Sequence, residues 1–296
     1  MSPDVIDKLR EAGRVAAAAR DHGAALIVAG ARVRDVCEAV EEEIRRRGAH
    51  PAFPAQSSRN QVAAHYCPSP EDESAYREGD LAKLDVGVHV DGYVVDTALT
   101  VNVGDAPWNR RLVSAARAAL EAAIAAAGPG VEVRRLSAAI EKALRDFGAR
   151  PMRNLCGHGV GRWTVHCPPP IPNAPEDNGD RLEAGTVVAI EPFATDGRGV
   201  VAEEGEPEVF RLPPDKQPRS GDPVVVDAIR AFRGLPFARR DLKALPRQRV
   251  EETLRALRGE GTLAAYAPLA EATGRVVAQA EHTIYVGPES VEVLTR

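Results

Sequence analysis

The sequence predicts an α+β fold in which two similar halves each pack a pair of helices on a curved antiparallel sheet. Two observations support this prediction: an internal repeat offset by one hundred residues, and a β-hairpin signal that lies between the two copies. The chain has 296 residues and is 44% hydrophobic, which supplies a core for one large domain or for a domain with an insertion.

The repeat relates residues 30–51 to residues 130–151 without a gap. In both copies apolar side chains recur at i, i+3, i+7 and i+11, which is one face of an amphipathic helix, and a Gly and then a Pro follow. The matched apolar pairs are Val33 with Val133, Val36 with Leu136, Val40 with Ile140, and Ile44 with Leu144. Chance similarity is the weaker alternative, because the Gly and Pro endings match too. Two copies are too few for a solenoid, so we expect one domain with pseudo-twofold halves.

The hairpin signal is Asp91-Gly92, which stands between two runs of β-forming residues within 84–99. Asp-Gly favours a type I′ turn, since both central residues need positive φ. This turn pairs Asp85 with Ala98 and brings Asp96 to the same face, with the two carboxylates about 7 Å apart at Cβ. Asp is depleted in strands, so the ribbon either exposes this face to water or binds a metal with it.

The rest of the chain predicts further strands and an insertion. Residues 186–193 have the pattern of a buried strand, and residues 278–286 with 290–295 that of a terminal hairpin. Between 195 and 273, Pro-rich loops lead to helical sequence. We therefore expect a main, catalytic domain formed by residues 1–194 and 274–296, and an inserted helical, winged-helix-like subdomain formed by residues 195–273.

Composition excludes several functional classes. The net charge is −5, and no block of Lys and Arg indicates specificity for nucleic acid. No apolar run is long enough for a membrane span, and the N-terminus lacks the pattern of a secretory signal. The four cysteines have no zinc-knuckle spacing and read as reduced thiols. We expect a cytoplasmic protein that does not bind membranes.

Five side chains in or beside β-type segments are candidate metal ligands. They are Asp85, Asp96, His158, Glu191 and Glu281. Carboxylates with one imidazole suit Mn, Fe, Co or Zn better than a metal that prefers thiolates. Four negative charges match two divalent cations, and two adjacent cations can lower the pKa of a shared water towards neutrality. The pattern therefore predicts a hydrolase.

These ligands stand in motifs that resemble the five metal-binding motifs of methionine aminopeptidases, in order. The motifs are Leu84-Asp85-Val86-Gly87, Val95-Asp96-Thr97-Ala98, Gly157-His158-Gly159, Ile190-Glu191-Pro192-Phe193-Ala194-Thr195 and Ala278-Gln279-Ala280-Glu281-His282-Thr283. The resemblance extends from about Ala12 to the C-terminus, and the insertion is similar to the subdomain of the type II branch in its archaeal-like form, without an N-terminal extension. It implies the pita-bread fold.

The resemblance also implies a role for each ligand. Asp85 would chelate one metal, and Asp96 and Glu281 would bridge two. His158 and Glu191 would complete the second site. The cofactors would be two divalent ions of Co, Mn, Fe or Zn.

Further residues are assigned to the substrate by the same resemblance. His65 is similar to an active-site histidine near the substrate amine, and His166 to one that hydrogen-bonds the scissile carbonyl. Glu191 would also carry a proton to the leaving amine. The side pocket for methionine would be lined by Phe53, Phe193, Pro236 and Tyr266.

The implied function is removal of the initiator methionine from the N-termini of nascent polypeptides, by a monomer with a transient contact with the ribosome. Two alternatives share the fold: a proline-specific aminopeptidase or prolidase, and a non-catalytic binding protein that has lost the ligands. Prolidases and proline-specific aminopeptidases usually carry a long N-terminal domain. The non-catalytic binding proteins have lost the metal ligands. One local departure is Cys167-Pro168-Pro169-Pro170, for which we expect a stiff loop with Cys167 near the metals.

Overall fold

The computed structural model describes residues 1–176 and 179–296. Its α-helices are α1 (Pro3–Leu26), α2 (Val33–Arg46), α3 (Arg110–Ala126), α4 (Val133–Asp146), α5 (Pro223–Arg230) and α6 (Arg247–Gly259), with 3₁₀ turns η1 (Val103–Asp105) and η2 (Arg239–Leu242). None of the described helices is long and apolar enough to cross a membrane.

One large antiparallel sheet forms the centre of the fold. Within the described residues its strands are ordered β1-β4-β5-β17-β9-β7-β8, and β2 and β18 pair with β4 and β17. These strands are β1 (His50–Pro51), β2 (Gln56–Arg59), β4 (Leu81–Val90), β5 (Tyr93–Asn102), β7 (Cys156–Gly161), β8 (Thr164–Pro172), β9 (Val187–Ile190), β17 (Glu281–Val286) and β18 (Val291–Val293). Shorter sheets contain β3 (Val62–Ala64), β6 (Arg150–Pro151), β10 (Phe193–Thr195), β11 (Val201–Glu203), β12 (Val209–Arg211), β13 (Phe237–Ala238), β14 (Ala264–Tyr266), β15 (Leu269–Glu271) and β16 (Val277–Gln279).

The internal repeat is visible as two matching units. Helices α2 and α4 both have 14 residues and begin and end at positions one hundred apart. Gly48 and Gly148 follow them with positive φ of 85° and 67°, which glycine adopts without steric cost. Short strands β1 and β6 come next and pair with β4 and β10. The predicted pseudo-twofold halves are confirmed.

The Asp91-Gly92 turn also forms as predicted. Asp91 has φ 51° and Gly92 has φ 85°, as a type I′ turn requires. Strands β4 and β5 pair along their whole length, with Asp85 opposite Ala98 and Val90 opposite Tyr93. The register of the ribbon therefore places Asp85 and Asp96 on one face.

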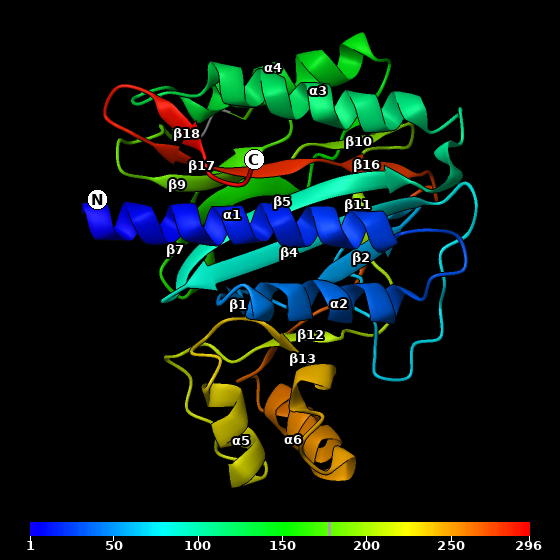
Figure 1. The fold of residues 1–296 in the computed structure, drawn as a ribbon, viewed down its shortest axis with the longest axis vertical. Helices are drawn as coiled ribbons and strands as arrows, with labels where there is room; N and C mark the ends of the chain where they lie inside the picture. Colours follow the sequence, from blue (N-terminus) through cyan, green and yellow to red (C-terminus); the bar gives the residue numbers. More distant parts are fainter. Residues whose placement is uncertain (177–178) are drawn as a thin grey trace.

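The helices cover the sheet as two pairs (Figure 1). Helix α1 lies across β4 and β5 next to α2, whereas α3 and α4 lie together on the other side of α1. Apolar side chains of α1 and α2 pack with β4 in one core, and those of α3 and α4 pack with β9 and β17 in a second. This is the α+β architecture expected from the repeat.

The inserted segment forms a lobe at one end of the molecule (Figure 1). Helices α5 and α6 pack with β12 and β13 around a separate core that includes Phe210, Phe237 and Leu254. Strand β15 joins this region to the main body because it pairs with both β11 and β3. The boundaries 195 and 273 stay a prediction.

The expectation of a loop at Pro168-Pro169-Pro170 is wrong. These residues belong to β8, the last strand of the large sheet's main path. Prolines are tolerated on an edge strand and at a bulge, where some backbone N–H positions have no partner in the sheet. The pairing with β7 is irregular at this place, between Gly157 and Gly159.

Candidate active site

Strand register gathers the predicted ligands on one face of the sheet. Asp85 and Glu281 both lie opposite Ala98, from β4 and β17 on either side of β5. Beyond β17, His282 pairs with Ile190 and His158 pairs with Ala189. Alternate residues share a face, so Glu191 and His158 face the same side as Glu281.

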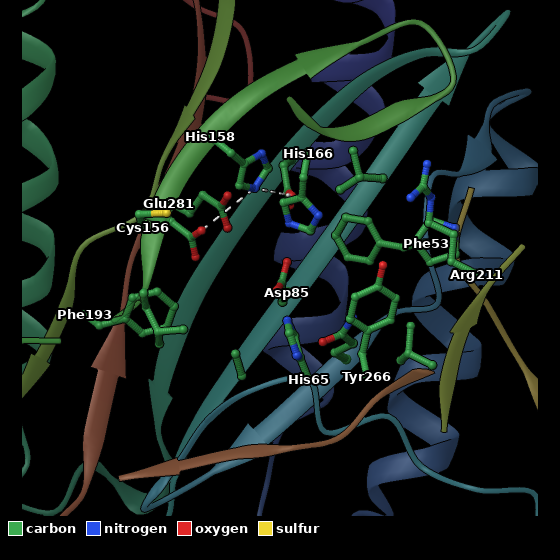
Figure 2. A pocket seen from close by; sticks show the side chains of 18 of the residues that line it. Phe53, His65, Asp85, Cys156, His158, His166, Phe193, Arg211, Tyr266 and Glu281 are labelled. Atoms are coloured by element: carbon green, nitrogen blue, oxygen red, sulfur yellow. Dashed lines mark ion pairs between the residues drawn. The ribbon is translucent and has the colours of Figure 1, made fainter. Parts of the chain in front are cut away.

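The ligand atoms lie close together in this arrangement (Figure 2). His158 Nε2 is 3.7 Å from Asp96 Oδ2 and 3.8 Å from Glu191 Oε1. One ligand atom each of Asp96, His158 and Glu281 lies within 4.8 Å of the others. These four side chains, together with Asp85, form what we name the metal-ligand cluster: Asp85, Asp96, His158, Glu191 and Glu281.

Backbone contacts between β5 and β17 hold the two central carboxylates. The Asp96 N–H donates to Thr283 Oγ1 at 2.7 Å, and this hydroxyl in turn donates to the Asp96 carbonyl at 2.7 Å. Thr97 Oγ1 donates to the carbonyl of Glu281 at 3.0 Å. Both threonines are fully buried, so the carboxylates are fixed by a rigid sheet and not by mobile loops.

Three carboxylates of the cluster each have one oxygen without a hydrogen-bond donor. Asp85 Oδ1, Asp96 Oδ1 and Glu281 Oε1 are buried and have no hydrogen-bond partner among the described residues. A buried polar atom without a partner is costly and rare in native proteins. Divalent cations would supply the missing interactions, so the donor set fits the metals that the motifs imply.

Burial and mutual repulsion raise the pKa values of the four carboxylates in the cluster. Burial raises the pKa of Asp85 to about 7. Burial, followed by the charges of Glu281 and Asp85, raises the pKa of Asp96. Burial and neighbouring carboxylates likewise raise the pKa of Glu191 and Glu281. Four carboxylates that repel one another need positive charge between them.

The three site histidines are held in the neutral form. Burial, followed by the charge of His166, lowers the pKa of His158 to about 3, and the two rings meet edge to face at 4.2 Å. Burial, with the charges of His65 and Arg211, lowers the pKa of His166 to about 4. His65 has a left-handed backbone with φ 67°, and its ring lies edge-on to Tyr266 at 5.9 Å.

A cavity of about 310 Å³ opens over the cluster, and we name it the central cavity. It is lined by all five ligands and by every residue predicted to contact the substrate: Phe53, His65, His166, Phe193, Pro236 and Tyr266. Figure 2 shows Phe53 and Tyr266 on one side of Asp85 and Phe193 on the other. The cavity therefore combines a charged centre with apolar walls, as small-molecule sites do.

The model of metallopeptidase family M24 matches residues 7–287. The chain belongs to this family. It is 42% identical to the methionine aminopeptidase of Archaeoglobus fulgidus, over 100% of both chains, and 42% identical to that of Pyrococcus horikoshii, over 98% of this chain and 99% of the relative. The crystal structure of the Thermotoga maritima methionine aminopeptidase covers 100% of this chain and 98% of its own, with a TM-score of 0.75 and 25% identity.

Membership of family M24 confirms the predicted relationship to methionine aminopeptidases and the pita-bread fold. It also supports the use of divalent metal by the protein, since the family is one of metallopeptidases and the described residues include a candidate metal cluster. The number and identity of the ions stay a prediction.

Sequence reasoning missed some residues of this M24 cavity. Cys156 lines it, whereas Cys167, expected near the metals, is not among the lining residues. Strand parity with His158 could have identified Cys156, because the two are separated by one residue in β7. Arg211 also lines the cavity and donates from Nε to the Gly234 carbonyl at 2.8 Å. No sequence signal pointed to Arg211, which comes from the insertion.

Proposed function

We propose that the protein removes the N-terminal methionine from polypeptides by metal-assisted hydrolysis. The observation that supports this most is the metal-ligand cluster, with its unpartnered carboxylate oxygens, at the floor of a cavity with aromatic walls. The full-length similarity to proteins named methionine aminopeptidase supports the choice of methionine as the first residue.

We propose that the cluster holds two divalent ions of Co, Mn, Fe or Zn. Asp85 would chelate one ion, Asp96 and Glu281 would bridge both, and His158 and Glu191 would complete the second. When bound, such ions act as Lewis acids on a carbonyl group and lower the pKa of water. Four carboxylates against one cation would leave an excess of buried negative charge, which supports two ions over one.

The protein's own side chains would position the substrate and move the proton. A neutral His166 can donate a hydrogen bond to the scissile carbonyl oxygen, where negative charge develops. A neutral His65 stands on the Tyr266 side of the cavity and would contact the substrate amine. Glu191 would accept a proton and pass it to the leaving amine. The wall residues Phe53 and Phe193 would enclose the thioether side chain.

The proposal is tested with metal-reconstituted, full-length protein on two peptide sets. One set carries Met before a small residue, as in Met-Ala-Ser, and the other carries Xaa-Pro. We expect turnover of the methionyl set and not of the Xaa-Pro set. Preference for Xaa-Pro would assign a prolidase instead, and absence of both activities with metal bound would favour a non-catalytic binding protein.

We propose nascent polypeptide N-termini as the substrates. A cytoplasmic location, a monomeric state and a transient contact with the ribosome stay predictions. Sedimentation of the purified protein would test the oligomeric state, and co-sedimentation with ribosomes would test the contact.

A further inference from the structure

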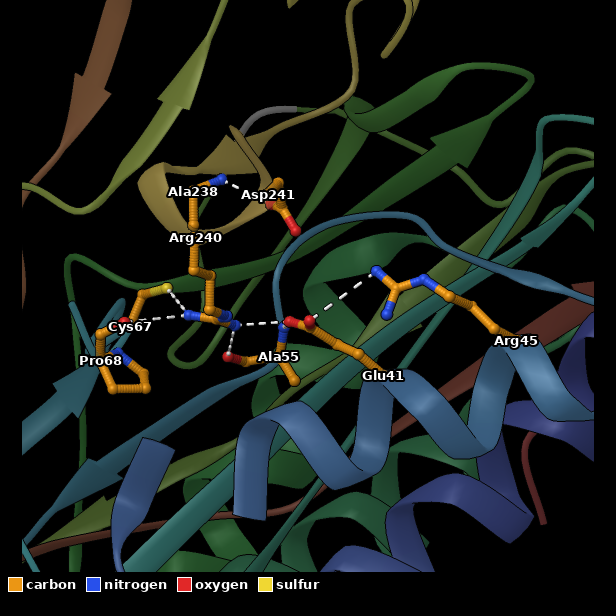
Figure 3. Close-up of polar contacts among 8 residues, drawn as sticks. All are labelled: Glu41, Arg45, Ala55, Cys67, Pro68, Ala238, Arg240 and Asp241. Atoms are coloured by element: carbon orange, nitrogen blue, oxygen red, sulfur yellow. Dashed lines mark hydrogen bonds and ion pairs between the residues drawn. The ribbon is translucent and has the colours of Figure 1, made fainter. Parts of the chain in front are cut away.

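Arg240 is an arginine enclosed almost completely by protein, with 4% of its surface exposed. It stands in η2 of the inserted segment, yet its guanidinium group reaches into the main body (Figure 3). Nη2 donates to Glu41 Oε1 of α2 at 2.5 Å and to the Ala55 carbonyl at 3.0 Å. Nη1 donates to Cys67 Sγ at 2.7 Å and to the Pro68 carbonyl at 3.1 Å.

We name this set of residues the Arg240 cluster: Arg240, Glu41, Ala55, Cys67 and Pro68. Glu41 closes it into a ring, because its Oε1 also accepts from the Ala55 N–H at 3.0 Å. The backbone of Ala55 is therefore held at both its N–H and its carbonyl. A planar guanidinium group is suited to such a fixed set of acceptors.

Two of the segments that Arg240 contacts, and the segment that carries Arg240 itself, each supply a wall residue of the central cavity. Phe53 lies two residues before Ala55, His65 lies two residues before Cys67, and Pro236 lies four residues before Arg240 itself. Next to Ala55, Gln56 also lines the cavity and pairs directly with the metal-ligand candidate Asp85. One side chain thus connects three wall segments from distant parts of the sequence.

A second hollow lies behind part of this wall. A second cavity of about 330 Å³, which we name the rear cavity, is lined by Phe53 and Pro236 as well. These two residues therefore separate two open spaces. The Phe53 ring is buried against the backbone of Gly87 in β4, so the sheet supports the partition on one side and the two cavities border it elsewhere. Its position depends on the backbone on which it is carried.

We propose that Arg240 is a positioning residue, which sets the distance between the Phe53, His65 and Pro236 walls and so determines the fit of the substrate's first side chain. This proposal depends on the proposed function only for the identity of that side chain. It places the effect of Arg240 on substrate binding and not on the metal-ligand cluster, since none of the described contacts of Arg240 involves a predicted ligand.

The test compares Arg240→Lys with Arg239→Lys in full-length, metal-loaded protein. Lysine keeps the charge but cannot reach four acceptors at once. Arg239 is the matched control because it is adjacent, is partly buried and pairs only with the insertion residues Glu208 and Glu251. Glu41→Gln is a third, milder variant that keeps the shape of the partner, in case Arg240→Lys does not fold.

We expect Arg240→Lys to raise KM for Met-Ala-Ser about tenfold and to leave kcat within about twofold, as loss of binding common to ground and transition states does. Glu41→Gln should change KM in the same direction by less. Metal content should stay at the wild-type level. Arg239→Lys should leave KM unchanged even where its melting temperature falls as far as that of Arg240→Lys.

Equal KM values in the two Arg variants would overturn the proposal and leave Arg240 a purely structural residue. A fall in kcat together with metal content would also overturn it. Hydrogen exchange supplies a readout without turnover: residues 53–56 and 64–68 should exchange faster in Arg240→Lys than in Arg239→Lys. If wild-type protein does not cleave methionyl peptides, the proposed function fails, and equal exchange in the two variants would then overturn the positioning role separately.

Discussion

Two buried groups of charges in this molecule are built in opposite ways. In the Arg240 cluster, Glu41 has a cation and a backbone N–H as partners, and its oxygen Oε1 is used twice. In the metal-ligand cluster, oxygens of Asp85, Asp96 and Glu281 have no partner among the described residues. Glu41, Asp96 and Glu281 are all buried, so burial alone does not account for the difference.

The difference distinguishes a structural charge from a ligand. Burying an ion is costly unless the protein supplies opposite charge and hydrogen bonds. Glu271 is a second buried carboxylate that has hydrogen-bond partners. It accepts from the N–H groups of Arg198, Gly199 and Thr273, and its pKa is lowered. The pKa values of the cluster carboxylates are raised instead. Several neighbouring carboxylates with unpartnered oxygens, raised pKa values and no arginine or lysine partner therefore indicate where a metal cation would bind.

The largest expected effect comes from removing a bridging carboxylate. Asp96→Asn or Glu281→Gln should abolish peptide hydrolysis and metal binding together, because each removes a negative charge from the centre of the cluster. Turnover and metal content of the purified variants measure this. Glu271→Gln is the matched control: it should keep full metal content and activity while losing about 1–3 kcal/mol of stability.

Wild-type turnover in either cluster variant would contradict the dinuclear assignment. Loss of metal and activity in Glu271→Gln as well would mean that any buried carboxylate of this sheet supports the site indirectly. The contrast between satisfied and unsatisfied carboxylates would then carry no functional information.

A smaller effect is expected from His166→Ala. Loss of one hydrogen-bond donor to a developing oxyanion lowers kcat by about 10²–10³. Metal content should remain at the wild-type level, since His166 is not one of the five predicted ligands. His22→Ala, on the exposed face of α1, is the control that should change nothing. Unchanged kcat in His166→Ala would remove its proposed role.

Much of this site could be predicted because sheet geometry is periodic. The Asp91-Gly92 turn determined the register of β4 and β5, and that register placed Asp85 opposite Ala98. The repeat likewise predicted α2 and α4 with their glycine endings. In both cases a local rule, the turn type or the helical period, is sufficient to determine the structure.

The remaining features depend on contacts between distant segments, to which no periodicity applies. Arg240 meets Glu41 across 199 positions of sequence, and nothing in the pattern around either residue indicates this pair. Arg211 reaches the cavity from the insertion in the same way. The expectation for Cys167 was wrong because three prolines were read as a loop, whereas an edge strand accepts them.

Metal removal should lower the stability of the protein by an amount that depends on pH, because of the carboxylates in the metal-ligand cluster. The carboxylates of the metal-free site have raised pKa values in the folded state, Asp85 to about 7. Between about pH 4 and 7 the folded protein then binds more protons than the unfolded chain, so its stability falls as pH rises. Chelation should therefore lower the melting temperature by several degrees more at pH 7.5 than at pH 5.

Thermal unfolding with and without chelator, at both pH values, measures this. Glu281→Gln should show no change on chelation at either pH, because it is expected to bind no metal. A chelation effect that is equal at pH 5 and pH 7.5 would contradict the raised pKa values.

The smallest expected effect concerns Arg211, whose side chain is only partly satisfied by hydrogen bonds. Its Nε donates to the Gly234 carbonyl, but its terminal nitrogens have no acceptor among the described residues, and its charge lowers the pKa of His166. Arg211→Met removes this charge, so the pKa of His166 should rise and the acid limb of kcat/KM should move to higher pH by about a few tenths of a unit. Arg211→Lys keeps the charge and should leave the limb in place. A shift in both variants would mean that the fork geometry of Arg211, and not its charge, acts on His166.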